Sequence, residues 1–184
     1  AWEFHNHNSG PSSIRTPYTV PNVRTEFHSS DSPLRTGAYR ALAATANTFA
    51  RECAMDELAH AVGMDPLAFR LKNLKDDRLR AVLEAAAKRF GWGAEEPAVG
   101  RGFGLACGAE KGGDVASCAA VAVDGGRVRV VRAVSAFECG AVLNPDHLKN
   151  QVEGCLMMGL GGALTEHIDF ADGKVLNPNF ADYK

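Results

Sequence analysis

The chain has 184 residues, of which 46% are hydrophobic and 23% are charged, and its formal net charge is −2. This composition is typical of a globular protein with a buried core and excludes a disordered chain. The 20 Lys and Arg residues are scattered among 22 Asp and Glu residues, so we expect no nucleic-acid partner. Every apolar stretch is interrupted before the roughly 18 residues that a bilayer helix needs, so the sequence predicts no membrane span.

The first 33 residues are rich in Asn, Ser, Pro and His, and we expect them to form an extended segment with one strand near Val23–His28. This segment holds few core residues of its own, so it should lean on another part of the protein. The chain begins with Ala1 rather than Met and stops at Lys184, directly after a strand-like stretch. We therefore interpret the sequence as a piece of a longer chain.

Three helices are predicted next. Apolar residues between positions 42 and 62 recur at helical spacing, and Gly63 supplies a left-handed stop. The pair Asp65-Pro66 combines an N-cap with proline at the first helical position, and it opens a short second helix. A third helix, apolar on one face, runs from near Asp77 and ends at Gly91.

The pattern then changes to the alternation typical of strands. We predict strands at residues 103–107, 115–123 and 128–137, a helix at 146–164 capped by Asn144-Pro145, and a small hairpin near 170–175. The turn Asp124-Gly125-Gly126 should join the second and third strands into an antiparallel hairpin. The predicted fold class is therefore α+β, with mixed helices and antiparallel hairpins.

The last long helix contains an unusual number of glycines, namely Gly154, Gly159, Gly161 and Gly162. Each costs a helix interior about 1 kcal/mol relative to Ala, so a specific need for small residues is indicated. That need is either close packing against a neighbouring element or close approach of a bulky ligand. Gln151 lies near the start of the same helix, where its amide and the unpaired N–H groups of the first turn favour a polar or anionic ligand.

A second candidate is the segment Ser32-Pro33-Leu34-Arg35-Thr36-Gly37-Ala38-Tyr39-Arg40, in which a loop leads into the first long helix. The planar guanidinium of Arg35 can hold an oxo or carboxylate group through two parallel hydrogen bonds. The alternative is a solvated surface arginine beside a helix start.

The histidines and cysteines give weaker signals. His5 and His7 could hold a metal at a strand edge, but polar terminal histidines are more often solvated, so we predict no metal ligand. The five cysteines form no C-x-x-C pair, and we expect buried reduced thiols and no iron–sulfur cluster held by this chain. Cys139 with His147 as nucleophile and base is a remaining alternative.

Two ordered sets of motifs resemble a known family. The first is Leu34-Arg35-Thr36-Gly37, Phe49-Ala50-Arg51-Glu52, Met55-Asp56-Glu57-Leu58-Ala59, Gly63-Met64-Asp65-Pro66-Leu67 and Phe69-Arg70-Leu71-Lys72-Asn73-Leu74. The second is Glu138-Cys139-Gly140, Asn144-Pro145-Asp146, Gln151-Val152-Glu153-Gly154, Gly159-Leu160-Gly161, Ala163-Leu164-Thr165-Glu166 and Asn179-Phe180-Ala181-Asp182-Tyr183. They resemble the large, molybdopterin-binding subunit of the xanthine dehydrogenase/aldehyde oxidase family, in particular its bacterial isoquinoline oxidoreductase and aldehyde dehydrogenase type.

The resemblance implies a role for each matching residue. Arg35 would be the catalytic arginine that orients the substrate, and the backbone at Leu34 and Thr36 would touch the cofactor. Gln151 would hydrogen-bond the cofactor beside its metal, and Gly154 would let the pterin approach. The implied cofactor is molybdopterin cytosine dinucleotide, with iron–sulfur clusters only in a partner subunit.

The resemblance also implies the reaction, which is oxidation of a small aldehyde or N-heterocycle with water as the oxygen source. The family's glutamate base has no match here, so we expect the chain alone to be inactive. The alternative is a non-catalytic cofactor-binding or assembly module of the same fold. The implied organisation is an extended segment at residues 1–33 and a partial cofactor-binding domain at 34–184, with a helical part at 34–91 and a strand-helix-strand part at 101–184.

Overall fold

The computed structural model describes residues 1–31, 37 and 39–182. It divides into two compact units, Ala1–Cys139 and Gly140–Lys184. The first unit contains β1 (Trp2–His7), β2 (Val23–His28), α1 (Ala44–Ala61), α2 (Pro66–Asn73), α3 (Asp77–Phe90), β3 (Arg101–Glu110), β4 (Gly113–Asp124) and β5 (Arg127–Glu138). The second contains α4 (Pro145–Leu164), β6 (Phe170–Ala171), β7 (Lys174–Val175) and the short 3₁₀ helix η1 (Phe180–Asp182). The predicted α+β class is confirmed, whereas the predicted division at residue 33 stays a prediction.

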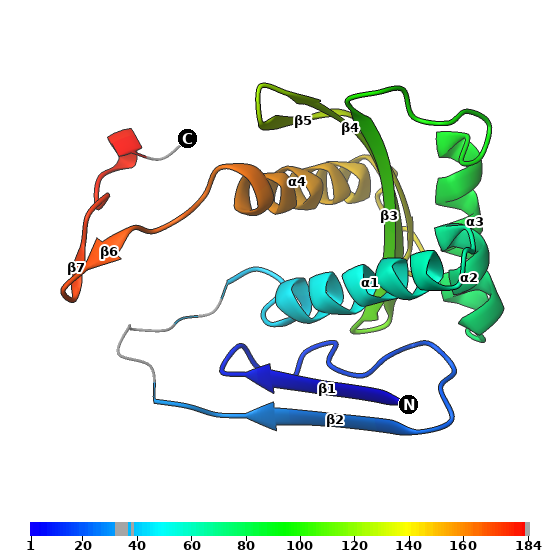
Figure 1. Cartoon of the computed structure of the whole chain (residues 1–184), viewed down its shortest axis with the longest axis horizontal. Coiled ribbons are helices and arrows are strands. Elements are labelled where there is room, and N and C mark those ends of the chain that lie inside the picture. Colours follow the sequence, from blue (N-terminus) through cyan, green and yellow to red (C-terminus); the bar gives the residue numbers. More distant parts are fainter. Residues whose placement is uncertain (32–36, 38, 183–184) are drawn as a thin grey trace. The chain divides into compact units, whose positions relative to one another are not determined.

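The N-terminal segment forms a two-stranded parallel sheet (Figure 1). β2 matches the predicted strand, and it pairs with β1 in a register that places His5 opposite Glu26 and His7 opposite His28. Parallel strands need a connection of a dozen or more residues, so no local pattern indicates that β1 and β2 pair. The segment leans on α1, as expected, because the Asn6 side chain donates a 2.6 Å hydrogen bond to Asn47 Oδ1.

The three helices of the first unit are confirmed, and their ends follow local rules. The carboxylate of Asp65 accepts a 2.9 Å hydrogen bond from the Ala68 N–H at the start of α2. Gly91 ends α3 in the left-handed conformation, with a φ of 77°. α1 begins at Ala44, because Ala41 and Leu42 both have positive φ values and cannot continue a right-handed helix. The prediction that Leu42 belongs to this helix was therefore wrong.

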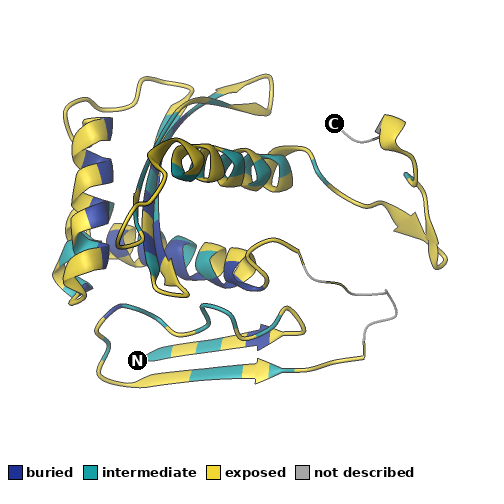
Figure 2. Cartoon of the chain, turned by 180° about the vertical axis from the view of Figure 1, so that it is seen from behind, coloured by how far each residue is buried: buried dark blue, intermediate teal, exposed yellow. Residues whose placement is uncertain are grey.

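The core lies between α3 and an antiparallel sheet of order β3-β4-β5. Alternate residues of β4 are buried, including Ala116, Cys118 and Ala120, as a half-buried strand requires. They meet the face of α3 that is buried (Figure 2). Leu79 and Leu83 lie on this face, and both are fully covered. The strand alternation seen in the sequence therefore sets which face of the sheet carries the core.

The second unit consists mainly of α4, which is followed by the small hairpin β6–β7. Both elements were predicted from the sequence and are confirmed. No residue of α4 is buried. Among the helices that the structure describes, none combines the length and the apolar character that crossing a bilayer would require.

Candidate cofactor-binding site

Three of the five predicted site residues, Leu34, Arg35 and Thr36, lie outside the described residues. Their roles stay predictions. The other two, Gln151 and Gly154, lie on α4, three residues apart. Residues with this spacing share one face of a helix, so the glutamine amide and the bare glycine backbone are neighbours on the surface of α4.

The start of α4 is fixed by a side-chain cap. Asn144 Oδ1 accepts a 2.9 Å hydrogen bond from the His147 N–H, and the Asn144 carbonyl accepts a 3.0 Å hydrogen bond from the Leu148 N–H. Pro145, at the first helical position, has no N–H to offer. The predicted cap is confirmed, and it occupies the His147 N–H, which is one of the first-turn donors that the sequence suggested for an anion.

The glycines of α4 divide into two kinds. A methyl group added at Gly154, Gly159 or Gly162 would meet no atom of the described residues within 4 Å. At Gly161 the added carbon would collide with Glu166 Oε1, and the Gly161 carbonyl accepts 2.9 Å hydrogen bonds from the Thr165 and Glu166 N–H groups. The contact with Glu166 at the end of the helix therefore explains the glycine at position 161. At the other three positions no described atom occupies the place of a side chain, so close packing within the described chain does not explain these glycines.

The apolar side chains of α4 are half-buried or exposed. Met157 has 66% of its surface exposed and Leu164 has 45%. A helix of 20 residues without a buried position normally covers its apolar surface with further protein or a ligand. The face that carries Gln151 and Gly154 therefore fits a bulky cofactor with polar groups, because it combines a donor and acceptor amide with a position where no side chain stands.

A buried charge network, which the sequence did not reveal, holds α1 in the first unit. The Glu52 carboxylate accepts hydrogen bonds from Arg70 Nε at 2.9 Å, Arg51 Nε at 3.1 Å, the Tyr18 hydroxyl at 3.0 Å and the Cys107 N–H at 3.2 Å. These partners come from α2, α1, the segment after β1, and β3. Glu52 therefore ties the helix that follows the predicted arginine loop to the rest of its unit. The run Phe49-Ala50-Arg51-Glu52 contributed to the family resemblance, but no local pattern indicated the distant partners of Glu52.

Arg70 completes the network from α2. Its side chain is fully buried, and Nη1 donates a 2.6 Å hydrogen bond to Asp56 Oδ1. Burial alone would lower the pKa of Arg70, but the carboxylates of Glu52 and Asp56 outweigh this effect and raise it. Burial also raises the pKa of Tyr18, so its hydroxyl stays protonated and donates to Glu52. Two arginines thus balance two carboxylates, and their buried groups are hydrogen-bonded. The network therefore stabilises the position of α1 in its unit.

The cysteines only partly follow the prediction. All five are free, and Cys107 and Cys118 are buried, where burial raises their pKa values to about 12 and about 11. Cys139 and Cys155 are exposed, so the expectation that every thiol is buried was wrong. The two lie in small-residue and apolar stretches that the core of the described chain does not reach. Cys139 and His147 belong to different units, and the hydrolase alternative stays a prediction.

Two protein families match this chain, and both are described as molybdopterin cofactor-binding domains. One matches residues 5–74 and the other matches residues 114–184. A nicotinate dehydrogenase subunit of Pseudomonas putida is 31% identical over 185 residues, which cover 91% of this chain and 16% of that protein. The beta subunit of isoquinoline 1-oxidoreductase of Brevundimonas diminuta is 33% identical over 140 residues, with coverage of 73% and 18%.

A membrane-bound aldehyde dehydrogenase (pyrroloquinoline-quinone) of Gluconacetobacter polyoxogenes is 28% identical over 170 residues, with coverage of 81% of this chain and 22% of that protein. The chain thus spans between 16% and 22% of the length of these three relatives. It belongs to the molybdopterin-binding subunits of the xanthine dehydrogenase family. The resemblance found in the sequence is confirmed.

Proposed function

We propose that this chain forms part of the cofactor-binding region of a molybdenum-dependent oxidoreductase that hydroxylates a small aldehyde or N-heterocycle with water as the oxygen source. The observation that carries the proposal is the face of α4 on which Gln151 lies beside Gly154, a half-buried position where an added side chain would meet no described atom. Matches to molybdopterin-binding families over both parts of the chain support it.

Each site residue has a separate task in this proposal. The Gln151 amide donates to and accepts from polar groups of the cofactor, and Gly154 gives the pterin room that a side chain would fill. The bound molybdenum cofactor, which we take to be the cytosine dinucleotide form, supplies the redox chemistry. Arg35 orients the substrate, and the backbone at Leu34 and Thr36 contacts the cofactor.

Substrate and electron partner follow from the same reasoning. Two of the relatives are named for nicotinate and isoquinoline, both of which are aromatic N-heterocycles with an electron-poor carbon beside the ring nitrogen. A third is named for an aldehyde. These names favour a small planar substrate with an electron-poor carbon. A partner subunit that carries the iron–sulfur clusters would remove the electrons.

The proposal is tested on the full-length parent protein by measuring molybdenum by mass spectrometry and pterin by fluorescence after oxidation. We expect about one of each per chain. In the variant Gln151→Leu, the loss of the amide should lower both contents about 10-fold or more, as loss of a group that orients a metal site commonly does. The matched variant Glu153→Leu changes an exposed neighbour on α4 and should keep both.

Three results would contradict the proposal. They are a pure, active parent without molybdenum and pterin, a parent that holds pyrroloquinoline quinone instead, and equal cofactor contents in the two leucine variants. If the parent binds the cofactor but has no glutamate base downstream of Lys184, the chain serves as a non-catalytic cofactor-binding or assembly module.

A further inference from the structure

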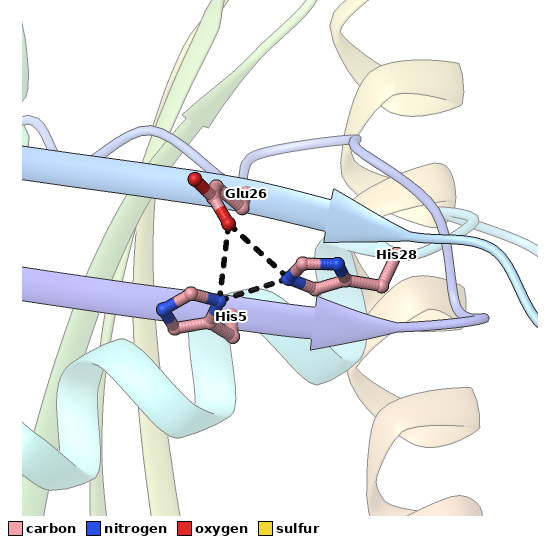
Figure 3. A group of neighbouring side chains, drawn as sticks. All are labelled: His5, Glu26 and His28. Carbon is pink, nitrogen blue, oxygen red and sulfur yellow. Dashed lines mark hydrogen bonds and ion pairs between the residues drawn. The ribbon is translucent and has the colours of Figure 1, made fainter.

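Three side chains on the parallel sheet β1–β2 converge on one point (Figure 3). The register sets His5 opposite Glu26 and His7 opposite His28, and alternate residues of a strand share a face. His5, Glu26 and His28 therefore project from the same side of the sheet. Each of them offers one ligating atom, and the three atoms lie within 4.8 Å of one another. We call this group the His5–Glu26–His28 cluster.

Two of the three distances in the cluster fit a single bound ion as they stand. His5 Nδ1 lies 2.9 Å from His28 Nε2, and Glu26 Oε2 lies 3.6 Å from the first nitrogen and 3.4 Å from the second. Zinc–ligand bonds of about 2.0–2.2 Å in a tetrahedron place neighbouring ligand atoms roughly 3.3–3.6 Å apart. The distance between the two nitrogens is shorter than such an edge and is that of a hydrogen bond between the imidazoles, so the two rings would have to separate by about 0.4 Å to share an ion. The two carboxylate distances exceed the ordinary hydrogen-bond range and match the edges of a coordination tetrahedron.

Outer contacts hold two of the ligands in the required orientation. His5 Nε2 lies 3.0 Å from Glu3 Oε1, so the ring donates its N–H on that side and turns the lone pair of Nδ1 towards the cluster. A histidine that donates its second N–H to a carboxylate is the usual arrangement at protein metal sites. Arg24 Nε donates a 2.8 Å hydrogen bond to Glu26 Oε1, which leaves Oε2 facing the two imidazoles.

Charge at the cluster favours a cation. Arg24 Nη1 lies 3.4 Å from Glu3 Oε1, and Arg24 Nε lies 2.8 Å from Glu26 Oε1. Two carboxylates therefore face one guanidinium, which leaves one excess negative charge beside the imidazoles. The His7 ring stacks on the His28 ring at a centroid distance of 4.7 Å and completes the surroundings.

We propose that His5, Glu26 and His28 bind one divalent transition-metal ion of the zinc class, with solvent at the remaining coordination position. Two imidazoles and one carboxylate are a ligand set that suits zinc, cobalt, nickel and copper. The side chains are 34%, 36% and 40% exposed for His5, Glu26 and His28, so an ion and its water have access. The ion would join β1 to β2, because each strand supplies a ligand. This sheet has two strands, which on their own are marginally stable.

The site lies entirely within the first unit and does not depend on the molybdenum cofactor. It differs from the expectation drawn from the sequence, which considered His5 with His7 and predicted no metal ligand. His5 and His7 share a face, but it is the pairing with β2 that brings Glu26 and His28 to His5.

The test is titration of the chelator-treated chain with Co²⁺, followed by visible absorption, and with Zn²⁺, followed by calorimetry. We expect one ion per chain, and Co²⁺ bands typical of tetrahedral nitrogen and oxygen ligation. His28→Gln and Glu26→Gln should each weaken binding at least 10-fold, and Glu3→Gln should weaken it less. The matched control His60→Gln removes an exposed histidine outside the cluster and should bind like the parent chain.

Thermal unfolding gives an independent readout. Saturating Zn²⁺ should raise the melting temperature of the parent chain and of His60→Gln, but not of His28→Gln, because a ligand that binds only the folded form stabilises it. Circular dichroism without metal shows whether each variant folds. If His28→Gln does not fold, the proposal is tested on Glu26→Gln, because this substitution keeps the shape of the side chain. Absence of a stoichiometric ion, or equal affinity in Glu26→Gln and His60→Gln, would overturn the proposal.

Discussion

The substitution Glu52→Gln should destabilise the first unit severely. The carboxylate of Glu52 accepts from Arg51, Arg70, the Tyr18 hydroxyl and the Cys107 N–H. Glutamine has the same shape but keeps one acceptor oxygen, and its NH₂ group would face these donors. Breaking one partner of a buried ion pair costs about 3–5 kcal/mol, because the remaining charge is left uncompensated.

Two features of the network place the expected loss within that range. The Arg70 side chain has no exposed surface, and that of Arg51 has 3%, so water cannot replace the lost carboxylate. Arg70 keeps Asp56 as a second partner, which should hold the loss near the lower end.

Urea unfolding followed by circular dichroism measures the loss directly. The control Glu57→Gln removes an exposed carboxylate from the same helix and should change the free energy of unfolding by less than about 0.5 kcal/mol. A loss below about 1 kcal/mol for Glu52→Gln would refute the view that this network anchors α1.

Three further predictions follow from α4 and from the thiols. At pH 8 the exposed Cys139 should react with a thiol reagent at least 100-fold faster than Cys107, whose pKa burial raises to about 12, and mass mapping with and without urea would measure this. Gly154→Ala should stabilise the helix by about 0.5–1 kcal/mol in urea unfolding of this chain, because no described atom opposes the added methyl group. Asn144→Ala should cost about 0.5–2 kcal/mol through loss of the cap, whereas Asn150→Ala should not destabilise the helix.

The parts of the fold that could be predicted depend on local chemistry. Asp65 and Asn144 cap helices because a short acceptor side chain reaches an N–H a few residues ahead, and Gly91 ends a helix because it adopts a left-handed conformation without strain. The turn at Asp124–Gly126 joins two strands that are adjacent in sequence. All of these signals lie within a few residues of the feature that they determine.

The remaining features depend on contacts between distant parts of the chain. The pairing of β1 with β2 brings Glu26 to His5, and the Glu52 network gathers residues from Tyr18 to Cys107. Neither follows from spacing in the sequence. The exposure of Cys139 differs from the prediction for the same reason, since an apolar neighbourhood in sequence does not ensure a covering element in space.

The cofactor content of two α4 variants of the full-length parent tests the central claim most directly. Gly154→Val and Ala163→Val each place the same β-branched side chain on this helix. Val is slightly better than Gly but worse than Ala in a helix, so helix stability alone would penalise Ala163→Val rather than Gly154→Val. If the pterin approaches the backbone at Gly154, molybdenum per chain should fall at least 10-fold in Gly154→Val and stay near the parent value in Ala163→Val. Equal molybdenum contents in the two variants would contradict the claim that this face of α4 receives the cofactor.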